Sequence, residues 1–310
     1  MLTLLDFLTA QSRIKPYLHP TLLEPSVTLG AGVYFKLENT NLTHAFKIRG
    51  ALNAILAQAD IARERGIIAA SAGNHAVGVA YAAQLADATA TLVMPRQTPQ
   101  RKVEGARRLG ATIVLYGDIY DEAEIHAREL EQREGTLFVS PYNDPYVIAG
   151  QGTISLELLE TIPSISRILV PTSGGGLLAG VATAAKLINP AIEVIGVQSV
   201  ATPAMYNAFY GTDHSQLDTI ADGLAGKIEE GSITVPLCRQ YTDRIVLVEE
   251  QAIHESIRWV FRQHGWAIEG AAAVGVAALL TGQIEPQAGT VVIISGGNID
   301  VEKFLHVMAE

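Results

Sequence analysis

Three short glycine-rich segments in this chain of 310 residues each follow a run of apolar residues. They are Ser71–His75, Ser173–Leu177 and Ser295–Asn298. The carboxyl ends of strands in open α/β sheets face the ligand crevice, and a glycine-rich turn that begins a helix can close its N–H groups on a phosphate or carboxylate. Taken alone, Ser173–Leu177 is equally consistent with anion binding and with a tight turn between a strand and a helix.

The same loop also meets the loose dinucleotide pattern Gly174-x-Gly176-x-x-Ala179. That pattern requires an acidic residue at the end of the next strand, about 20 residues further on. Glu193 stands at the start of that strand and Gln198 at its end, which disfavours a nicotinamide cofactor. The nucleotide-binding pattern GxxxxGK[ST] does not occur in the sequence.

Lysine is scarce, and Lys47 has an unusual position among the seven lysines. It opens the predicted helix Ile48–Gln58, where the helix dipole lowers the pKa of an amine. The other lysines, including Lys36 as a satisfied charge on an edge strand, are consistent with surface positions. An anion loop together with such an amine suggests pyridoxal phosphate held on Lys47 as a Schiff base, the alternative being a solvent-facing lysine.

The elements that must position these groups follow an alternating order of strands and helices, which predicts an α/β protein. Several strands are apolar on both faces, as in a buried parallel sheet. The predicted strands are Val33–Leu37, Ile67–Ala70, Thr91–Met94, Thr112–Leu115, Arg167–Val170, Glu193–Val197, Arg244–Val248 and Thr290–Ile294. The predicted helices are Ile48–Gln58, His75–Ala86, Arg101–Leu109, Tyr120–Arg133, Gly152–Leu159, Gly176–Ile188, Glu250–His264 and Ala271–Leu280.

Composition limits the classes of partner. The formal charge of −10 disfavours general binding to nucleic acid or to an anionic membrane surface. The single cysteine, Cys238, excludes an internal disulfide framework and a cysteine-rich metal site. Asp6 interrupts the apolar start of the chain, which makes a secretory signal peptide improbable, and the longest apolar run, Gly270–Leu280, is too short to span a bilayer. We therefore expect a cytoplasmic protein.

Six motifs occur in order along nearly the whole chain: Phe46–Ala51, Ser71–Ala76, Ala149–Thr153, Ser173–Leu177, Ala221–Gly223 and Ser295–Asn298. Together they closely resemble the fold-type-II pyridoxal-phosphate enzymes of the threonine dehydratase and serine racemase group, and most of all the short catabolic threonine dehydratases. The resemblance implies two open parallel-sheet lobes, as in the tryptophan synthase β-subunit, with the cofactor in the cleft between them. It also implies a large domain of residues 1–65 and 144–310, a small domain of residues 66–143, and a homodimer.

The resemblance implies a role for each motif residue. Lys47 forms the Schiff base and then acts as the base at Cα. Phe46 and Gly223 cover the two faces of the pyridine ring. Asn74 donates to the 3-hydroxyl group, and Ser295 meets the ring nitrogen. The phosphate is cradled by Ser173, Gly174, Gly175, Gly176 and Leu177. The substrate carboxylate is held by Ser71, Ala72, Gly73, Asn74 and His75.

Ala72 is the most informative departure from the group. Serine racemases carry a serine there as the acid–base group opposite the lysine, so alanine should weaken racemisation and leave elimination intact. Ser173 replaces a usual glycine, and its hydroxyl is expected to add a phosphate contact. The segment at residues 198–202 has no acidic residue where metal-dependent relatives have them, so no metal is expected there.

Two further departures bear on the substrate. His44 and Ala45 stand where the group usually has glycine and serine, and are expected to alter the pocket entrance or the surroundings of the lysine. Trp266 is bulkier than the group's usual residue and either belongs to the core or narrows the pocket.

The leading interpretation is therefore β-elimination of L-threonine and L-serine to a 2-oxo acid and ammonia. Alternatives are a lyase or β-replacement enzyme for another β-substituted amino acid, such as a hydroxyaspartate or a phenylserine, and a serine racemase. From another class, the chain could be a non-catalytic protein that binds an amino acid or a nucleotide.

Overall fold

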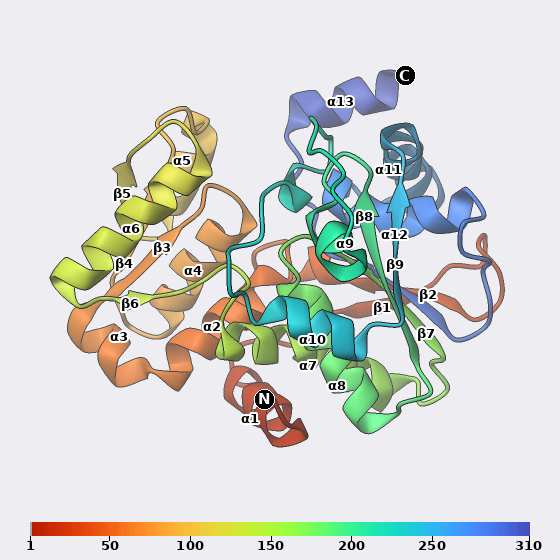
Figure 1. The fold of residues 1–310 in the computed structure, drawn as a ribbon, viewed down its shortest axis with the longest axis horizontal. Coiled ribbons are helices and arrows are strands. Elements are labelled where there is room, and N and C mark those ends of the chain that lie inside the picture. Colours follow the sequence, from red (N-terminus) through yellow and green to blue (C-terminus); the bar gives the residue numbers. More distant parts are fainter. Residues whose placement is uncertain (1) are drawn as a thin grey trace.

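Two β-sheets organise the chain, of which the computed structural model describes residues 2–310. Met1, the first residue of the expected large domain, lies outside the described residues. The larger sheet has the order β1 (Leu22–Pro25), β2 (Val33–Leu37), β10 (Thr290–Ile294), β7 (Arg167–Pro171), β8 (Glu193–Ser199), β9 (Arg244–Val248). The smaller sheet has the order β5 (Thr112–Leu115), β4 (Ala90–Met94), β3 (Ile67–Ala70), β6 (Leu137–Phe138). In Figure 1 the smaller sheet lies to the left and the larger sheet to the right.

All eight predicted strands are confirmed, and where two of them are neighbours they pair in parallel. The sequence analysis missed β1 and β6. β6 has only two residues, and β1 pairs antiparallel with β2, so the larger sheet is mixed at one edge. Pro25 ends β1, as suits an edge strand, because proline cannot donate to a second neighbour.

The continuous apolar runs are explained by burial of both faces of each sheet. In β10, Val292 and Ile294 belong to one hydrophobic cluster, whereas Val291 and Ile293 belong to another on the opposite face. In β3, Ile67 and Ile68 divide in the same way between two clusters of the smaller sheet. Alternate side chains of a strand point to opposite faces, so a strand covered on both sides must be apolar throughout.

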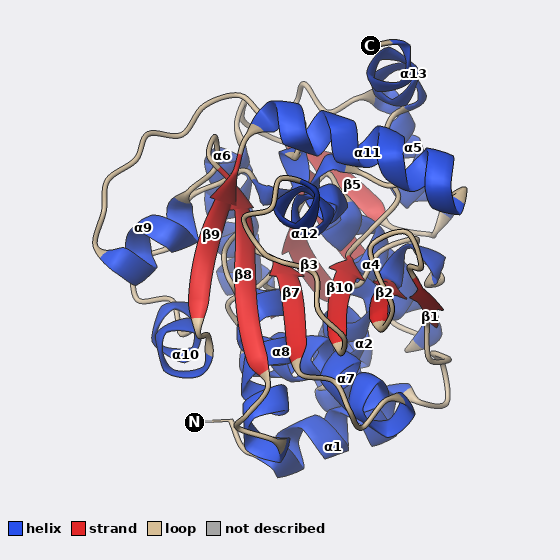
Figure 2. Ribbon diagram, turned by 90° about the vertical axis from the view of Figure 1, so that its right-hand side faces the viewer, coloured by secondary structure: helices blue, strands red, loops and turns tan. Residues whose placement is uncertain are grey.

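Thirteen α-helices are described. Eight were predicted: α2 (Lys47–Ala57), α4 (Asn74–Leu85), α5 (Gln100–Arg108), α6 (Tyr120–Glu134), α7 (Pro145–Thr161), α8 (Gly176–Ile188), α11 (Glu250–His264) and α12 (Gly270–Leu280). Five were missed: α1 (Leu4–Ile14), α3 (Ala59–Arg65), α9 (Ala204–Tyr210), α10 (Thr234–Tyr241) and α13 (Val301–Ala309). Figure 2 shows α11 and α12 over one face of the larger sheet.

The start of α7 was predicted seven residues too late, at Gly152. The helix begins at Pro145, after Asp144 whose carboxylate caps it by accepting from the N–H of Val147 at 2.8 Å. The glycines inside α7 serve close packing rather than a turn. A Cβ on Gly150 would lie 2.5 Å from the carbonyl oxygen of Arg49 in α2.

A cluster of four charged side chains lies in the interior between α2, α7 and β2. The fully buried guanidinium of Arg49 binds Glu38 at 2.8 Å and Glu157 at 2.5 Å. Lys36, which is 2% exposed, donates to Glu157 at 2.6 Å. The expectation that Lys36 is an edge charge was wrong, because β1 and β10 flank its strand and the ion pair takes the place of water.

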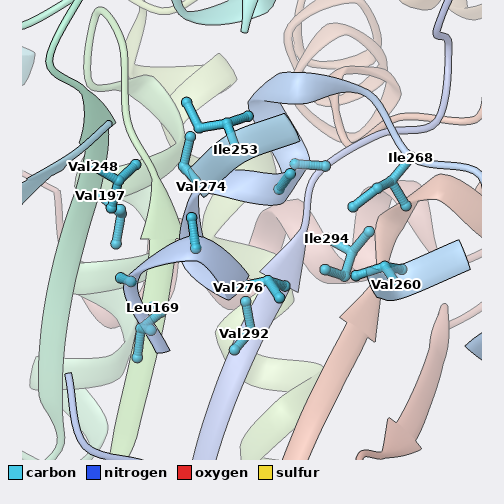
Figure 3. Close-up of a cluster of buried hydrophobic side chains, with 14 of the residues drawn as sticks. Leu169, Val197, Val248, Ile253, Val260, Ile268, Val274, Val276, Val292 and Ile294 are labelled. Atoms are coloured by element: carbon cyan, nitrogen blue, oxygen red, sulfur yellow. The ribbon is translucent and has the colours of Figure 1, made fainter. Parts of the chain in front are cut away.

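The core of the larger sheet fixes α12 in place. Val274 and Val276 of α12 pack among Leu169, Val197 and Val292 from three strands (Figure 3). Within residues 2–310, no helix is long and apolar enough to cross a membrane.

Candidate active site

The three glycine-rich turns and Lys47 line one cavity of about 590 Å³. Each turn follows the carboxyl end of a parallel strand: β3, β7 or β10. All the site residues predicted from the sequence line this cavity, namely Phe46, Lys47, Ser71, Ala72, Gly73, Asn74, His75, Ser173, Gly174, Gly175, Gly176, Leu177, Gly223 and Ser295. Their convergence is a finding, whereas the role of each remains a prediction.

Lys47 is the first residue of α2, and its Nζ donates a hydrogen bond of 2.7 Å to the carbonyl oxygen of Pro141. Burial lowers the pKa of Lys47 to about 8, against an opposing effect of the Glu269 carboxylate. The predicted direction is therefore confirmed, but the cause is removal of the ammonium from water rather than the helix dipole. A substantial fraction of the Lys47 side chain is the neutral amine near neutral pH.

The loop at residues 173–177 forms a cradle without side chains at its centre. The carbonyl of Gly174 is held away from the cavity, because it accepts a hydrogen bond of 2.6 Å from Thr234 Oγ1 in α10, which does not line the cavity. A peptide N–H points opposite to its C=O, so the N–H of Gly175 is turned toward the cavity. The N-terminus of α8 adds its own free N–H groups. The cradle therefore suits a phosphate.

Ser173 was expected to offer its hydroxyl to the phosphate. The hydroxyl instead donates to the carbonyl oxygen of Leu224 at 2.9 Å, which ties the loop to the segment that carries Gly223. A hydroxyl has one proton to donate, and the hydrogen bond to Leu224 uses it. Ser173 therefore offers an anion its main-chain N–H.

His75 lies at the start of α4 and is 3% exposed. Its Nε2 is 2.9 Å from the carbonyl oxygen of Val139, and since a carbonyl can only accept, Nε2 carries the proton. Burial, and after it the charge of Lys47, lowers the pKa of His75 to about 3, so the ring is neutral. Nδ1 is then an acceptor, with no partner within residues 2–310. An acceptor cannot bind a carboxylate, so only the main chain of His75 suits the predicted carboxylate pocket.

Glu269 is a buried acidic residue of the cavity lining that had no predicted role. It is 7% exposed and accepts from Asn74 Nδ2 at 2.8 Å. Burial, with the charge of Asp222 adding to it, raises the pKa of Glu269 to about 7. The sequence contained one indication that Glu269 is buried. It stands between apolar Ile268 and Gly270, which begins an apolar helix, so no exposed face is available for its carboxylate.

The residues expected to shape substrate choice lie outside the cavity lining. His44 is exposed and its Nδ1 is 3.3 Å from the carbonyl oxygen of Asn39. Ala45 is fully buried and pairs with Gly296 in an isolated bridge. Trp266 packs against the core of the larger sheet and donates to Glu24 at 2.8 Å. Of the two alternatives for Trp266, the core position is confirmed and the narrowed pocket is wrong. The expected effect of His44 and Ala45 on the pocket entrance or on the surroundings of Lys47 stays a prediction.

The residues of the cavity fit pyridoxal phosphate. The group needs an amine, an anion cradle and room for a flat ring, and the cavity offers Lys47, the loop at 173–177 and the space beside Gly223. The cradle is specific in shape, because Gly175 has φ of +91° and a Cβ on Gly176 would lie 2.8 Å from Tyr142. Lys47, Gly174–Leu177 and Ser295 would hold the group by its aldehyde carbon, its phosphate and its ring nitrogen.

Comparison with known proteins agrees with this fit. A family model described as pyridoxal-phosphate dependent enzyme matches residues 14–296. The L-threonine ammonia-lyase of Thermotoga maritima is 44% identical over 308 residues, covering 97% of this chain and 77% of that protein. The L-threonine dehydratase catabolic TdcB of Staphylococcus aureus is 40% identical over 316 residues, covering 98% and 91%. The structure of maize serine racemase matches with a TM-score of 0.90 at 34% identity, covering 99% of this chain and 96% of that one. The chain belongs to the pyridoxal-phosphate dependent enzymes.

Proposed function

We propose that the protein catalyses pyridoxal-phosphate-dependent β-elimination of L-threonine and L-serine, giving 2-oxobutyrate or pyruvate and ammonia. The observation that carries the proposal is the amine of Lys47, with a pKa of about 8, in the same cavity as a phosphate-binding cradle. The relatives named as L-threonine ammonia-lyase and dehydratase support threonine as a substrate.

Each step follows from groups on this chain. The N–H groups at the start of α4 bind and orient the substrate carboxylate. The neutral amine of Lys47 removes the proton from Cα, because part of it is unprotonated near pH 7. Bound pyridoxal phosphate supplies the electron sink that makes this proton acidic. The electron pair of the broken Cα–H bond forms the Cα=Cβ double bond, and hydroxide leaves from Cβ with the electron pair of the broken Cβ–O bond. The released enamine hydrolyses to the oxo acid and ammonia.

The remaining positions complete the site. Phe46 and Gly223 would cover the two faces of the bound ring, and Asn74 would donate to its 3-oxygen. The hydroxyl of Ser295 would meet the ring nitrogen, where it could not hold a proton as a carboxylate does. A weaker electron sink favours prompt loss of the β-substituent over transamination.

The deciding experiment measures 2-oxo acid formation from L-threonine and L-serine by the cofactor-loaded protein and by Lys47→Ala. Lys15→Ala is the matched control, because Lys15 is exposed and does not line the cavity. We expect oxo acid from wild type and the control, and none from Lys47→Ala. Turnover by Lys47→Ala would overturn the proposal. A colourless wild-type protein, even with added pyridoxal phosphate, would favour a non-catalytic binding protein.

A second candidate is elimination from a larger β-hydroxy amino acid. The cavity extends to Tyr120 and Asp121 at the start of α6 and to Lys227 across from them, leaving space beyond the glycine turns. A panel with 3-hydroxyaspartate and phenylserine separates this candidate from threonine. Racemisation of serine is disfavoured by Ala72, which has no exchangeable proton.

We further propose that residues 1–65 and 144–310 form the large domain and residues 66–143 the small domain, consistent with the strands of each sheet. The family resemblance supports a cytoplasmic homodimer. Light scattering of the eluted protein tests the dimer.

A further inference from the structure

Three polar side chains from distant parts of the chain form a hydrogen-bonded series at the edge of the cavity. Asn298, after β10, donates through Nδ2 to Asn74 Oδ1 at 2.8 Å. Asn74, at the start of α4, donates through its own Nδ2 to Glu269 Oε1 at 2.8 Å. Asn74 and Glu269 line the cavity, whereas Asn298 is exposed.

The two ends of the series fix the orientation of the Asn74 amide. The amide nitrogen of Asn298 can only donate, so Asn74 must turn Oδ1 to Asn298 and Nδ2 to Glu269, whose Oε1 accepts. A flipped amide would lose both hydrogen bonds. Nδ2 carries two hydrogens, and Glu269 takes one, so the second is free for another acceptor.

Glu269 is held rigidly enough to act in this way. It is the N-cap of α12, whose side chains are packed into the core of the larger sheet (Figure 3). Its main-chain N–H donates to the carbonyl oxygen of Gly296 at 3.2 Å. A Cβ on Gly296 would overlap Glu269 Oε1, so the carboxylate fits only beside glycine.

We infer that Glu269 and Asn298 are positioning residues that together lock the Asn74 amide, so that its second N–H faces the 3-oxygen of bound pyridoxal phosphate. The inference rests on the proposed function, which places that oxygen beside Asn74. A donor to the oxygen stabilises its anionic form, because hydrogen bonding to the charged form favours ionisation. Glu269 therefore acts on the electronic state of the cofactor without touching the reacting atoms.

The test is the absorption spectrum of the purified, cofactor-loaded protein, which reports the protonation of the 3-oxygen without turnover. Glu269→Ala and Asn298→Ala release opposite ends of the amide. Both should lower the long-wavelength band and raise the near-ultraviolet band, changing their ratio on the order of tenfold for the loss of one charge-assisted hydrogen bond. Glu269→Gln keeps an acceptor oxygen at the same place and should resemble wild type.

Each other outcome has a definite meaning. A wild-type spectrum in either alanine variant, with cofactor bound, would overturn the inference and leave the proposed function intact. A Glu269→Gln spectrum like that of Glu269→Ala would also overturn it, because the charge rather than the amide orientation would then matter. If Glu269→Ala does not fold, exposed Asn298→Ala with Glu269→Gln still decides the question. Wild type without any cofactor band would instead overturn the proposed function.

Discussion

The side-chain nitrogen of Lys47 lies 2.7 Å from the carbonyl oxygen of Pro141, in the segment that connects β6 to α7. A main-chain carbonyl accepts from an ammonium or an amine alike, so it holds the side chain without fixing its charge. The charge is set by burial, which the neighbouring Glu269 only partly offsets.

The first prediction concerns the capture of pyridoxal phosphate by the apo protein. Only the neutral amine of Lys47 attacks an aldehyde, so the rate should rise with pH and level off above the pKa of about 8. Stopped-flow absorbance measures the rate, with free N-acetyl-lysine amine as the reference. A rate that rises in parallel with this reference up to its ordinary pKa would contradict the prediction.

The second prediction concerns stability of the apo protein against pH. The pKa of Glu269 is raised from 4.5 to about 7, so the neutral carboxyl contributes stability that is full below 4.5 and is lost as pH rises through about 7. At alkaline pH the free energy of unfolding of Glu269→Gln should therefore exceed that of wild type by on the order of 3 kcal/mol. Urea unfolding from about pH 5 to pH 8.5 measures the difference. Parallel profiles for the two proteins would refute the assignment.

The third prediction compares two glycines with left-handed φ. Gly175 has φ of +91° in the phosphate cradle, and a Cβ there would overlap the end of the Met205 side chain and lie 3.0 Å from the Cβ of Thr234. Gly211 has φ of +72° with open space around it. Both alanine variants should lose about 1 kcal/mol of stability from backbone strain. Only Gly175→Ala should also weaken cofactor binding, by roughly tenfold or more, as titration of the absorption band would show.

The fourth prediction compares a buried with an exposed arginine. Arg49→Met leaves Glu38 and Glu157 with one cation, Lys36, between them, so it should cost about 3–5 kcal/mol of stability. Arg101→Met breaks an ion pair with Asp300 in which the arginine side chain is 58% exposed, and should cost less than about 1 kcal/mol. If denaturant unfolding gives the same loss of stability for Arg49→Met and Arg101→Met, the interior charged cluster does not stabilise α2.

The fifth prediction concerns Ala72, which lines the cavity. Ala72→Ser restores the hydroxyl that serine racemases have at this position, so the variant should form D-serine while it continues to form pyruvate. Deuterium incorporation at Cα of serine in heavy water measures proton return, and Ala72→Gly is the control for size. If Ala72→Ser incorporates no deuterium at Cα, a serine at this position is not sufficient to return a proton to the face of Cα opposite Lys47.

The sequence was sufficient for eight of the ten strands of residues 2–310 and for the glycine-rich turns that meet at the cavity. The reason is local, because apolar runs that end in glycine have few other structures open to them. Burial of side chains by distant segments was not predictable in this way. Lys36 can lie in the interior because it pairs with Glu157, which is 121 residues later in the sequence. The Ser173 hydroxyl is engaged because it donates to the carbonyl oxygen of Leu224.

The partner of Glu269 in the cavity could not be predicted from the sequence either, because it comes from a distant segment. Nothing near it in sequence indicates that Asn74, 195 residues earlier, becomes its partner. The family resemblance covered the glycine motifs, whose shape is local, and left the carboxylate unassigned. His44 and Trp266 were singled out as departures from the family's usual residues, and neither lines the cavity.

The place of β10 in the larger sheet has a consequence for biosynthesis. It is the last strand along the chain, yet it lies between β2 and β7 and carries Ser295 at its end. Until β10 leaves the ribosome, those two strands have no bridge between them and Phe46 lacks the Ser295 carbonyl to which its N–H donates at 3.0 Å. Domains form as units during synthesis. The larger sheet is therefore completed only after β10 has been synthesised, and the part of the cavity that Ser295 lines cannot form before then.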